Sequence, residues 1–221
     1  MNIEQARFNM IEQQIRTWEV LDQSVLSLLA VVKREDFVPA EHRSMAFIDM
    51  AVPLVDNGSL GRSMLEPKVE ARLLQELGVG KHEKVLEIGA GSGYMAALLA
   101  HKAQRVLSLE IDPELARFAA DNLKRAAVMN AEVRQADGSK GALAEGPFDV
   151  IVASGSVATV PQPLLDQLKV GGRLTTIVGH EPVMQAVLVT RVDQNAWRTE
   201  VLFDTMAPRL LGFDEPPKFR F

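Results

Sequence analysis

The spacing of apolar and polar positions changes several times along the chain, and each change predicts an element. In residues 5–35 the apolar positions recur at helical spacing, which predicts two helices that cap the main domain. Residues 36–67 hold prolines and glycines between short apolar pieces, and we interpret this segment as a long loop with a binding role. From residue 68 onward, helical and strand patterns alternate. The predicted helices cover 68–77, 93–102, 113–127 and 161–168, and the predicted strands cover 84–88, 105–110, 131–135, 148–153 and 172–178.

This alternation is typical of one fold class. Strands that alternate with helices form mostly parallel α/β sheets with helices on both faces, so we predict a Rossmann-like, doubly wound sheet. Two further runs alternate apolar and polar residues, Ala186–Val192 and Trp197–Phe203, with only Asp193–Ala196 between them. They predict an antiparallel hairpin at the C-terminal end of the domain.

A glycine-rich turn follows the predicted strand 84–88, with a carboxylate just ahead of it at Glu87. Glycines at alternate positions let the backbone turn sharply and let a ligand approach the main chain. A dinucleotide fold would have its third glycine one position later, where this chain has Tyr94. The spacing favours a cofactor without a pyrophosphate, and we predict S-adenosylmethionine (SAM), with Glu87 meeting the cation of its amino-acid end. The predicted cofactor loop consists of Gly89, Ala90, Gly91, Ser92 and Gly93.

Two further acidic positions follow strand ends. Glu110 ends the second core strand, seventeen residues after Gly93, where a carboxylate can accept both hydroxyls of a ribose. It could also simply begin a solvated helix, but the glycine loop before it favours the ribose. Asp137 and Gly138 follow the third core strand and are placed to meet an adenine. Asp-Gly is also a common turn dipeptide, and both interpretations stay open.

Composition narrows the classes of function. The chain has 221 residues, 47% of them hydrophobic and 24% charged, with a formal net charge of −5 and no basic run, which disfavours a nucleic-acid partner. It has no cysteine, and its four histidines are far apart, so we expect neither a disulfide nor a catalytic metal. Apolar runs too short for a bilayer and the lack of a signal-peptide pattern predict a cytoplasmic protein without a membrane partner. The oligomeric state stays open.

Several segments together resemble the protein-L-isoaspartate O-methyltransferases, SAM-dependent repair enzymes that esterify the abnormal carboxylate of isoaspartyl residues. The segments are REDFVPAEHRSMAFIDMAVPL, VLEIGAGSGYMAALLA and FDVIVASGSVATVPQPLLDQLKVGGRL. The resemblance implies a methyltransferase fold, SAM as cofactor, and isoaspartyl-containing proteins or peptides as substrate. It also implies a single domain with N-terminal helices and a substrate loop in 1–67, a SAM-binding core in 68–180, and a hairpin with a tail in 181–221.

The chain departs from the family in the substrate loop. The family usually has a glycine and, directly ahead of a proline, Thr-Ile-Ser and one variable residue, and its serine is thought to hold the substrate carboxylate. Alignment on Gly61 and Pro67 places Leu65 at that serine. Leucine cannot donate to a carboxylate, and Glu66 beside it would repel an anionic substrate. Ser63, Ser59, Arg62 and Lys68 are candidate replacement donors, and the candidate catalytic positions are Ser63, Leu65 and Glu66.

The chemistry keeps alternatives open. A carboxylate is ionised at neutral pH and needs no general base, so catalysis rests on holding oxygen, methyl carbon and sulfur in line. A neutral acceptor would need deprotonation, for which Glu66 would be useful. The alternatives to isoaspartyl transfer are therefore a SAM-dependent methyltransferase with a different acceptor and a non-catalytic SAM-binding relative.

Overall fold

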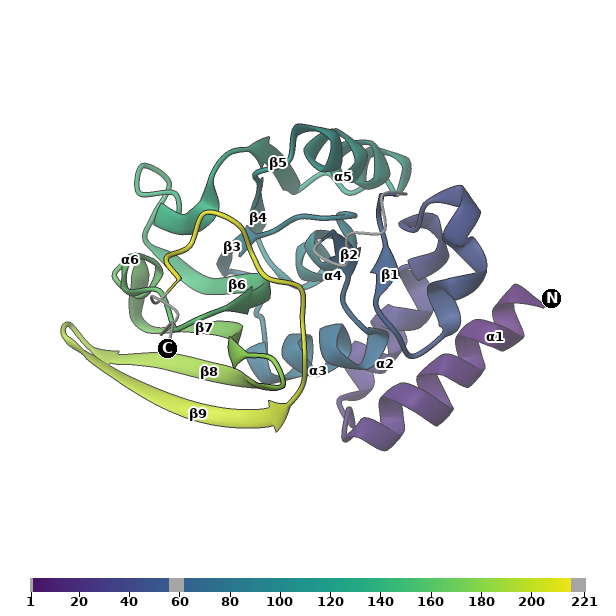
Figure 1. Ribbon diagram of the computed structural model, residues 1–221, viewed down its shortest axis with the longest axis horizontal. Helices are drawn as coiled ribbons and strands as arrows, with labels where there is room; N and C mark the ends of the chain where they lie inside the picture. Colours follow the sequence, from purple (N-terminus) through teal and green to yellow (C-terminus); the bar gives the residue numbers. More distant parts are fainter. Residues whose placement is uncertain (1, 56–61, 216–221) are drawn as a thin grey trace, which may run out of the picture.

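One sheet of seven strands forms the centre of the molecule (Figure 1). The computed structural model describes residues 2–55 and 62–215 of the chain. The strand order is β5-β4-β3-β6-β7-β8-β9; the first five strands in this order are parallel, and β8 and β9 are antiparallel. The strands are β3 (Lys84–Ile88), β4 (Arg105–Glu110), β5 (Ala131–Gln135), β6 (Phe148–Val157), β7 (Leu168–His180), β8 (Val183–Asp193) and β9 (Ala196–Asp204).

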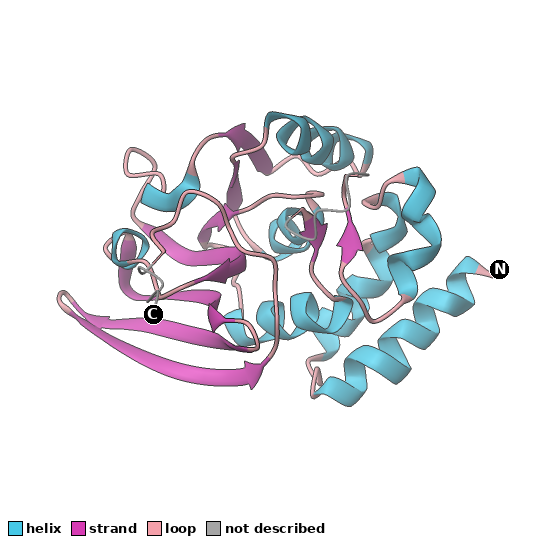
Figure 2. Cartoon of the chain, viewed as in Figure 1, coloured by secondary structure: helices cyan, strands magenta, loops and turns pink. Residues whose placement is uncertain are grey.

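Helices cover both faces of this sheet, as predicted (Figure 2). Neighbouring residues of a strand point to opposite faces, so Val85 packs on the side of α3, α4 and α5, whereas Leu86 packs on the side of α6. The α-helices are α1 (Ile3–Asn9), α2 (Gln23–Val31), α3 (Pro67–Leu77), α4 (Tyr94–Lys102), α5 (Pro113–Arg125) and α6 (Gln162–Leu165). Among the described residues, no helix is both long and apolar enough to cross a bilayer.

Local sequence explains where these helices begin. The carboxylate of Asp112 accepts the backbone N–H of Glu114 at 2.8 Å and thereby caps α5, whose first residue is Pro113. Helix α3 also begins at a proline, Pro67, and ends before Gly78, which has φ of +51°. The start of α5 and both ends of α3 are therefore fixed by the local sequence.

Some predicted boundaries are wrong. The helix predicted over 161–168 ends at Leu165, because Leu168 already pairs with Phe148 in the sheet. The strand predicted over 148–153 extends to Val157, which pairs with Val178. The C-terminal hairpin is present and longer than predicted, and the sheet continues through it from β7 into β8 and β9.

The N-terminal part contains the predicted helices and more structure than predicted. Helix α1 continues as a π-helix (Met10–Ile15) and a 3-10 helix (Arg16–Trp18), and α2 packs near α3. The segment 36–67, interpreted as a loop, contains a 3-10 helix (Ala40–Phe47) and a small antiparallel sheet. Its strands are β1 (Val52–Pro53) and β2 (Ser63–Met64). Elements this short carry no readable period in the sequence.

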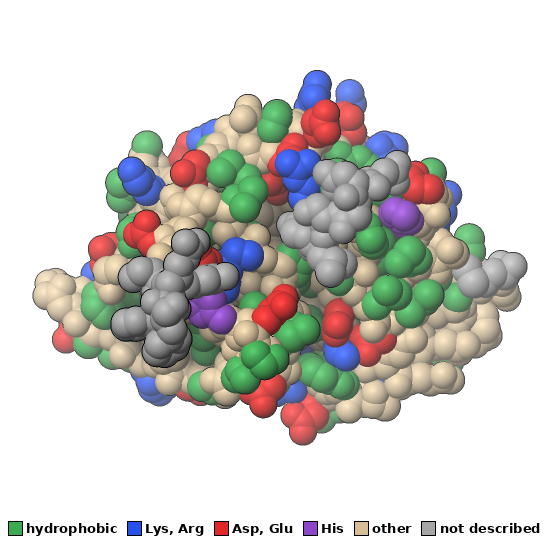
Figure 3. Space-filling view, viewed as in Figure 1, with side chains coloured by type: hydrophobic (Ala, Val, Ile, Leu, Met, Phe, Trp, Pro, Cys, Tyr) green, Lys and Arg blue, Asp and Glu red, His purple; other side chains and the backbone are tan. Residues whose placement is uncertain are grey.

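After β9 the chain crosses the carboxyl ends of the parallel strands, as the yellow segment in Figure 1 shows. We call residues 205–215 the C-terminal strap. The backbone N–H of Ser156 donates to Pro208 O at 2.7 Å, and Leu210 N–H donates to Ser156 O at 2.9 Å. The strap is thus tied to the end of β6. On the face seen in Figure 3, acidic and basic side chains are interspersed with apolar ones.

Candidate active site

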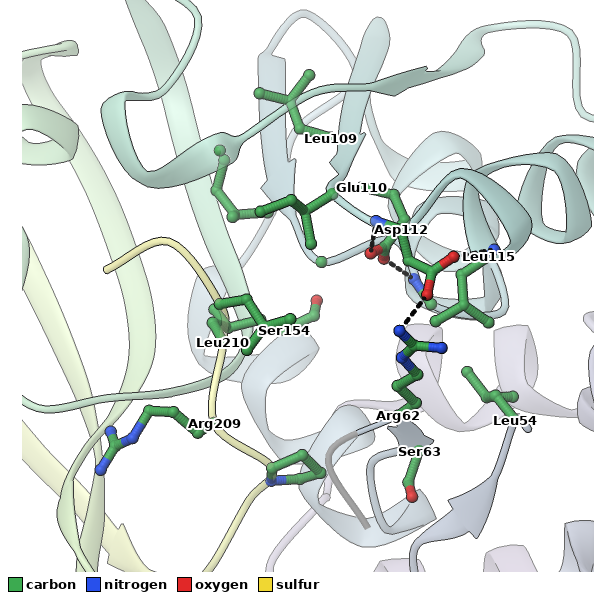
Figure 4. Close-up of a pocket in the computed structure, with 17 residues that line it drawn as sticks. Leu54, Arg62, Ser63, Leu109, Glu110, Asp112, Leu115, Ser154, Arg209 and Leu210 are labelled. Carbon is green, nitrogen blue, oxygen red and sulfur yellow. Dashed lines mark hydrogen bonds and ion pairs between the residues drawn. The ribbon is translucent and has the colours of Figure 1, made fainter. Parts of the chain in front are cut away.

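A pocket lies at the carboxyl ends of β3 and β4 (Figure 4). This edge is where ligands of open α/β sheets bind. The pocket is bordered by the glycine loop, the turn after β4, the start of β2 and the strap. Its lining residues include Leu54, Arg62, Ser63, Ile88, Gly89, Gly91, Leu109, Glu110, Ile111, Asp112, Gly138, Ser154 and residues 208–211.

The three glycines of the loop have different tasks. All have positive φ, +86° at Gly89, +51° at Gly91 and +82° at Gly93, which favours glycine. Gly89 and Gly91 line the pocket, so a ligand can approach their main chain. Gly93 lies outside the pocket lining, and a Cβ there would lie 3.0 Å from the carbonyl oxygen of Ala119 in α5. Gly93 therefore allows α4 to begin close against α5.

Backbone N–H groups fix the orientation of the Glu110 carboxylate. Its side chain is buried, and each carboxylate oxygen accepts one backbone N–H: Gly91 donates to Oε2 at 2.8 Å and Asp112 donates to Oε1 at 3.1 Å. A carboxylate has about four acceptor sites, so both oxygens keep capacity for a further donor. Because Glu110 lines the pocket beside Gly89 and Gly91, these residues fit the ribose of SAM.

Glu87, which the sequence predicts to meet the cation of SAM, is buried beneath the glycine loop. It is fully buried, and its carboxyl oxygens accept the hydroxyls of Ser108 at 2.6 Å and Ser154 at 2.8 Å. The pKa of Glu87 is raised to about 8, mainly by burial. The two hydroxyl hydrogen bonds lower it, and the nearby Glu70 and Glu110 contribute to the rise. The side chain is therefore held close to its neutral form at pH 7.

Glu87 lines a second, smaller cavity rather than the main pocket. The two cavities share four residues, Ser63, Gly89, Gly91 and Ser154. The smaller cavity is also lined by Leu65, Glu70, Ala90 and Ser92. It is therefore bordered both by the glycine loop and by the segment that leads into α3.

Asp137 and Gly138 form a turn, which is one of the two interpretations given for this dipeptide. The Asp137 carboxylate accepts the N–H of Ser139 at 2.9 Å, and Asp137 lines neither cavity. Gly138 does line the pocket, and a Cβ there would lie 2.5 Å from Ile88 Cγ2, so only glycine fits against β3. The contact of Asp137 with an adenine remains a prediction.

On the substrate side, Arg62 reaches across the mouth of the pocket. Its Nη2 lies 2.9 Å from Oδ2 of Asp112, the residue that caps α5 (Figure 4). The next residue, Ser63, lines both cavities. Ser59 and Gly61, which the sequence analysis also considered, lie outside the described residues.

Leu65 and Glu66 point to different places. The Leu65 side chain is 4% exposed and belongs to the apolar core, with one side on the smaller cavity. Glu66 lines neither cavity: its carboxylate lies 3.2 Å from Nζ of Lys68, in a groove beside Trp18. The Glu66 carboxylate is therefore not among the groups that line either cavity, where it was expected to repel an anionic substrate. Lys68 also pairs with Asp49 at 2.7 Å and faces the same groove.

The sequence analysis missed the buried pair of Arg34 and Glu70. The two side chains are ion-paired, and Arg34 Nη2 also donates to the carbonyl oxygen of Leu65 at 2.7 Å. Burial raises the pKa of Glu70 to about 7, although the Arg34 charge lowers it. Glu70 occurs on the apolar face of α3 with Leu73 and Leu74, and a carboxylate on such a face is the signal that could have identified it. The pocket-lining strap was also missed.

Comparison with known proteins agrees with this geometry. The sequence profile described as protein-L-isoaspartate(D-aspartate) O-methyltransferase (PCMT) matches residues 5–206. The protein-L-isoaspartate O-methyltransferase 1 of Syntrophobacter fumaroxidans is 40% identical over 189 residues, 86% of either chain. The protein-L-isoaspartate O-methyltransferase of Methanoculleus marisnigri is 40% identical over 173 residues, 78% of this chain and 77% of that one.

A solved structure has the same fold. It is a putative protein-L-isoaspartate O-methyltransferase from Plasmodium falciparum in complex with S-adenosyl-L-homocysteine, and it superposes with a TM-score of 0.76. The superposition covers 92% of this chain and 97% of that chain at 21% identity. Profile, relatives and fold agree along most of the sequence, and the chain belongs to the protein-L-isoaspartate (D-aspartate) O-methyltransferase family.

Proposed function

We propose that this enzyme transfers the methyl group of SAM to the abnormal carboxylate of isoaspartyl residues in damaged proteins or peptides. The names of its relatives support this substrate. The observation that carries the proposal is the position of Ser63, which lines both the cofactor pocket and the smaller cavity behind it. A hydroxyl at this junction can hold an acceptor carboxylate beside the cofactor.

The chain's task is to position the reactants. Bound SAM supplies a methyl group made electrophilic by its sulfonium. Glu110, whose orientation is fixed by two backbone N–H groups, would hold the ribose. The Ser63 hydroxyl donates to one oxygen of the substrate carboxylate and leaves the other oxygen to attack. Since an ionised carboxylate needs no general base, orientation and exclusion of water account for the catalysis.

The loss of the family serine at Leu65 is compatible with this assignment. In extended backbone, residues i and i+2 point to the same side, and Ser63 in β2 is two residues before Leu65. Both side chains line the smaller cavity. Ser63 therefore offers a hydroxyl to the same space from a neighbouring position. The alternative of a different acceptor, which relied on Glu66 as a base, loses its support because Glu66 lines the groove beside Trp18.

The test is transfer of labelled methyl from SAM to an isoaspartyl peptide, with the same peptide bearing normal aspartate as control. We expect base-labile label on the isoaspartyl peptide alone, since methyl esters hydrolyse in base. Calorimetry with S-adenosylhomocysteine establishes in parallel that the cofactor site is intact. Binding without label on the isoaspartyl peptide would overturn the proposed substrate.

A further inference from the structure

The ion pair between Arg62 and Asp112 spans the mouth of the cofactor pocket (Figure 4). Arg62 directly precedes β2, whereas Asp112 follows β4 and caps α5, so the pair joins two segments that lie far apart in the sequence. Arg62 Nη2 lies 2.9 Å from Asp112 Oδ2, and both residues line the pocket. A ligand in the pocket therefore has this ion pair at its boundary.

Asp112 is the fixed half of the pair. Its side chain is 9% exposed, and its other carboxylate oxygen, Oδ1, accepts the backbone N–H of Glu114 at 2.8 Å. Its own backbone N–H donates to Glu110 Oε1 at 3.1 Å. The carboxylate that receives Arg62 thus belongs to the same short turn that orients Glu110, the residue that fits the ribose.

Arg62 is the movable half. Its side chain is 38% exposed, so the guanidinium can turn into solvent without uncovering the core. Its main chain is held in place, because Arg62 O accepts the N–H of Leu54 at 2.8 Å and the next residue, Ser63, pairs with Pro53. Leu54 is buried, and its Cδ1 would lie 3.3 Å from a Cβ at Gly91. The main chain beside Arg62 therefore rests on the glycine loop, and the side chain alone reaches the start of α5.

We propose that the Arg62–Asp112 ion pair is a latch across the mouth of the cofactor pocket. It is closed over bound SAM and opens by rotation of the Arg62 side chain when the cofactor enters or leaves. A partly exposed ion pair contributes a modest free energy because water and salt screen it. A latch of this strength slows exchange several-fold and still releases the product once in each turnover. The inference rests on SAM as the cofactor and does not depend on the identity of the acceptor.

The first test measures how fast labelled S-adenosylhomocysteine leaves the full-length protein after an excess of the unlabelled compound is added. Arg62→Met keeps a long side chain and removes its charge, and we expect the dissociation rate constant to rise roughly two- to fivefold. The matched control is Arg16→Met, since Arg16 is also 38% exposed, pairs with Glu12 and lies outside the pocket lining. The control should release the compound at the rate of the unchanged chain. An unchanged or lower rate in Arg62→Met would overturn the latch.

A double-variant cycle attributes the effect to the pair. Asp112→Asn removes the charge and keeps an oxygen that can cap α5, and it should release S-adenosylhomocysteine as fast as Arg62→Met does. Because either substitution already breaks the same interaction, the variant that carries both should release the compound no faster than each single variant. Rate increases that multiply in the double variant would mean that the two side chains act separately, which contradicts the proposal.

Salt provides a third test. Raising NaCl from about 0.05 M to about 0.5 M screens a partly exposed ion pair, so release from the unchanged chain and from Arg16→Met should speed up, and release from Arg62→Met much less. The same salt dependence in all three proteins would argue against the latch. These measurements concern release of S-adenosylhomocysteine alone. A failure of isoaspartyl methylation would leave their outcome intact, and a chain that methylates an isoaspartyl peptide can still fail them.

Discussion

Arg34 holds the main chain of Leu65 in place from inside the protein. Its Nη2 donates to Leu65 O at 2.7 Å, its Nη1 pairs with Glu70, and its guanidinium lies 5.2 Å from the centre of the Tyr94 ring. The side chain of Arg34 is fully buried. One cation thus connects the substrate loop to α3 and α4, at the edge of the smaller cavity.

Removing this cation should destabilise the protein strongly. Arg34→Met leaves the buried Glu70 without its partner, and we expect the free energy of unfolding to fall by about 3–5 kcal/mol in urea denaturation. The matched control is Arg43→Met, which breaks an exposed pair with Asp36 and should cost about 1 kcal/mol or less. The double variant Arg34→Met with Glu70→Leu should recover most of the loss. Equal stability of the two single variants would show that the buried pair has no such role.

Ser63→Ala should impair catalysis more than cofactor binding. Loss of one hydrogen bond to a charged group costs about 1.5–3 kcal/mol, so we expect kcat/KM for an isoaspartyl peptide to fall roughly ten- to a hundredfold. The Kd for S-adenosylhomocysteine should change less than about threefold, because backbone N–H groups orient Glu110. Ser27→Ala, on the exposed side of α2, serves as the control.

A rescue experiment separates a lost hydroxyl from a disturbed loop. Since Ser63 and Leu65 both line the smaller cavity, Leu65→Ser added to Ser63→Ala should restore part of kcat/KM. If the double variant stays as low as Ser63→Ala and folds normally, a hydroxyl at position 65 does not reach the acceptor.

The stability of the cofactor-free protein should fall as pH rises. The pKa of Glu87 is raised from 4.5 to about 8, mainly by burial. Between these values the folded chain binds more protons than the unfolded chain. The contribution is therefore fully present below pH 4.5 and is lost as pH rises through 8. Glu70, with a pKa of about 7, acts in the same direction.

Chemical denaturation from pH 5 to pH 9 tests this dependence. In Glu87→Gln we expect a smaller fall in the free energy of unfolding, and the remaining fall should end near pH 7, where Glu70 titrates. Glu200→Gln, an exposed position on β9, should keep the slope of the unchanged chain. The same slope in Glu87→Gln would show that this carboxyl does not titrate as described.

Gly93 and Gly171 have nearly the same backbone conformation but differ in the space available to an added side chain. Their φ angles are +82° and +83°, so an alanine at either position is strained by about 1–2 kcal/mol. Only at Gly93 does the added Cβ meet a neighbour, 3.0 Å from Ala119 O, whereas nothing lies within 4 Å at Gly171. We expect Gly93→Ala to lose about 1–3 kcal/mol more than Gly171→Ala in urea denaturation. Equal losses would mean that α4 and α5 can move apart at no cost.

The core of the fold was predictable because β3 and β4 are buried along most of their length and therefore form continuous apolar runs. The ranges 84–88, 105–110 and 131–135 agree with β3, β4 and β5, since turn residues bound each run. The glycine loop follows β3 as predicted. The family match confirms the prediction that the chain is a methyltransferase and that its cofactor is SAM. Local pattern and overall fold point to the same structure here.

The parts that the sequence did not predict depend on contacts between distant segments. Strand β1 pairs with β2 over two residues only, and the strap has an irregular backbone, so neither has a period to detect. Glu66 was considered together with Leu65 because they are adjacent, yet the chain turns into α3 at Pro67 and separates their side chains. Burial of Glu70 likewise follows from its pairing with Arg34.

The residues that line the cofactor pocket are spread along the chain from Leu54 to Leu211, so the pocket is complete only when Leu211 has been synthesised. A ligand stabilises only the chain that can bind it. While the protein is being translated, the glycine loop is made long before residues 208–211, which line the same pocket. Cofactor can therefore protect the finished chain from proteolysis, whereas a nascent or truncated chain without Leu210 must depend on its own core packing.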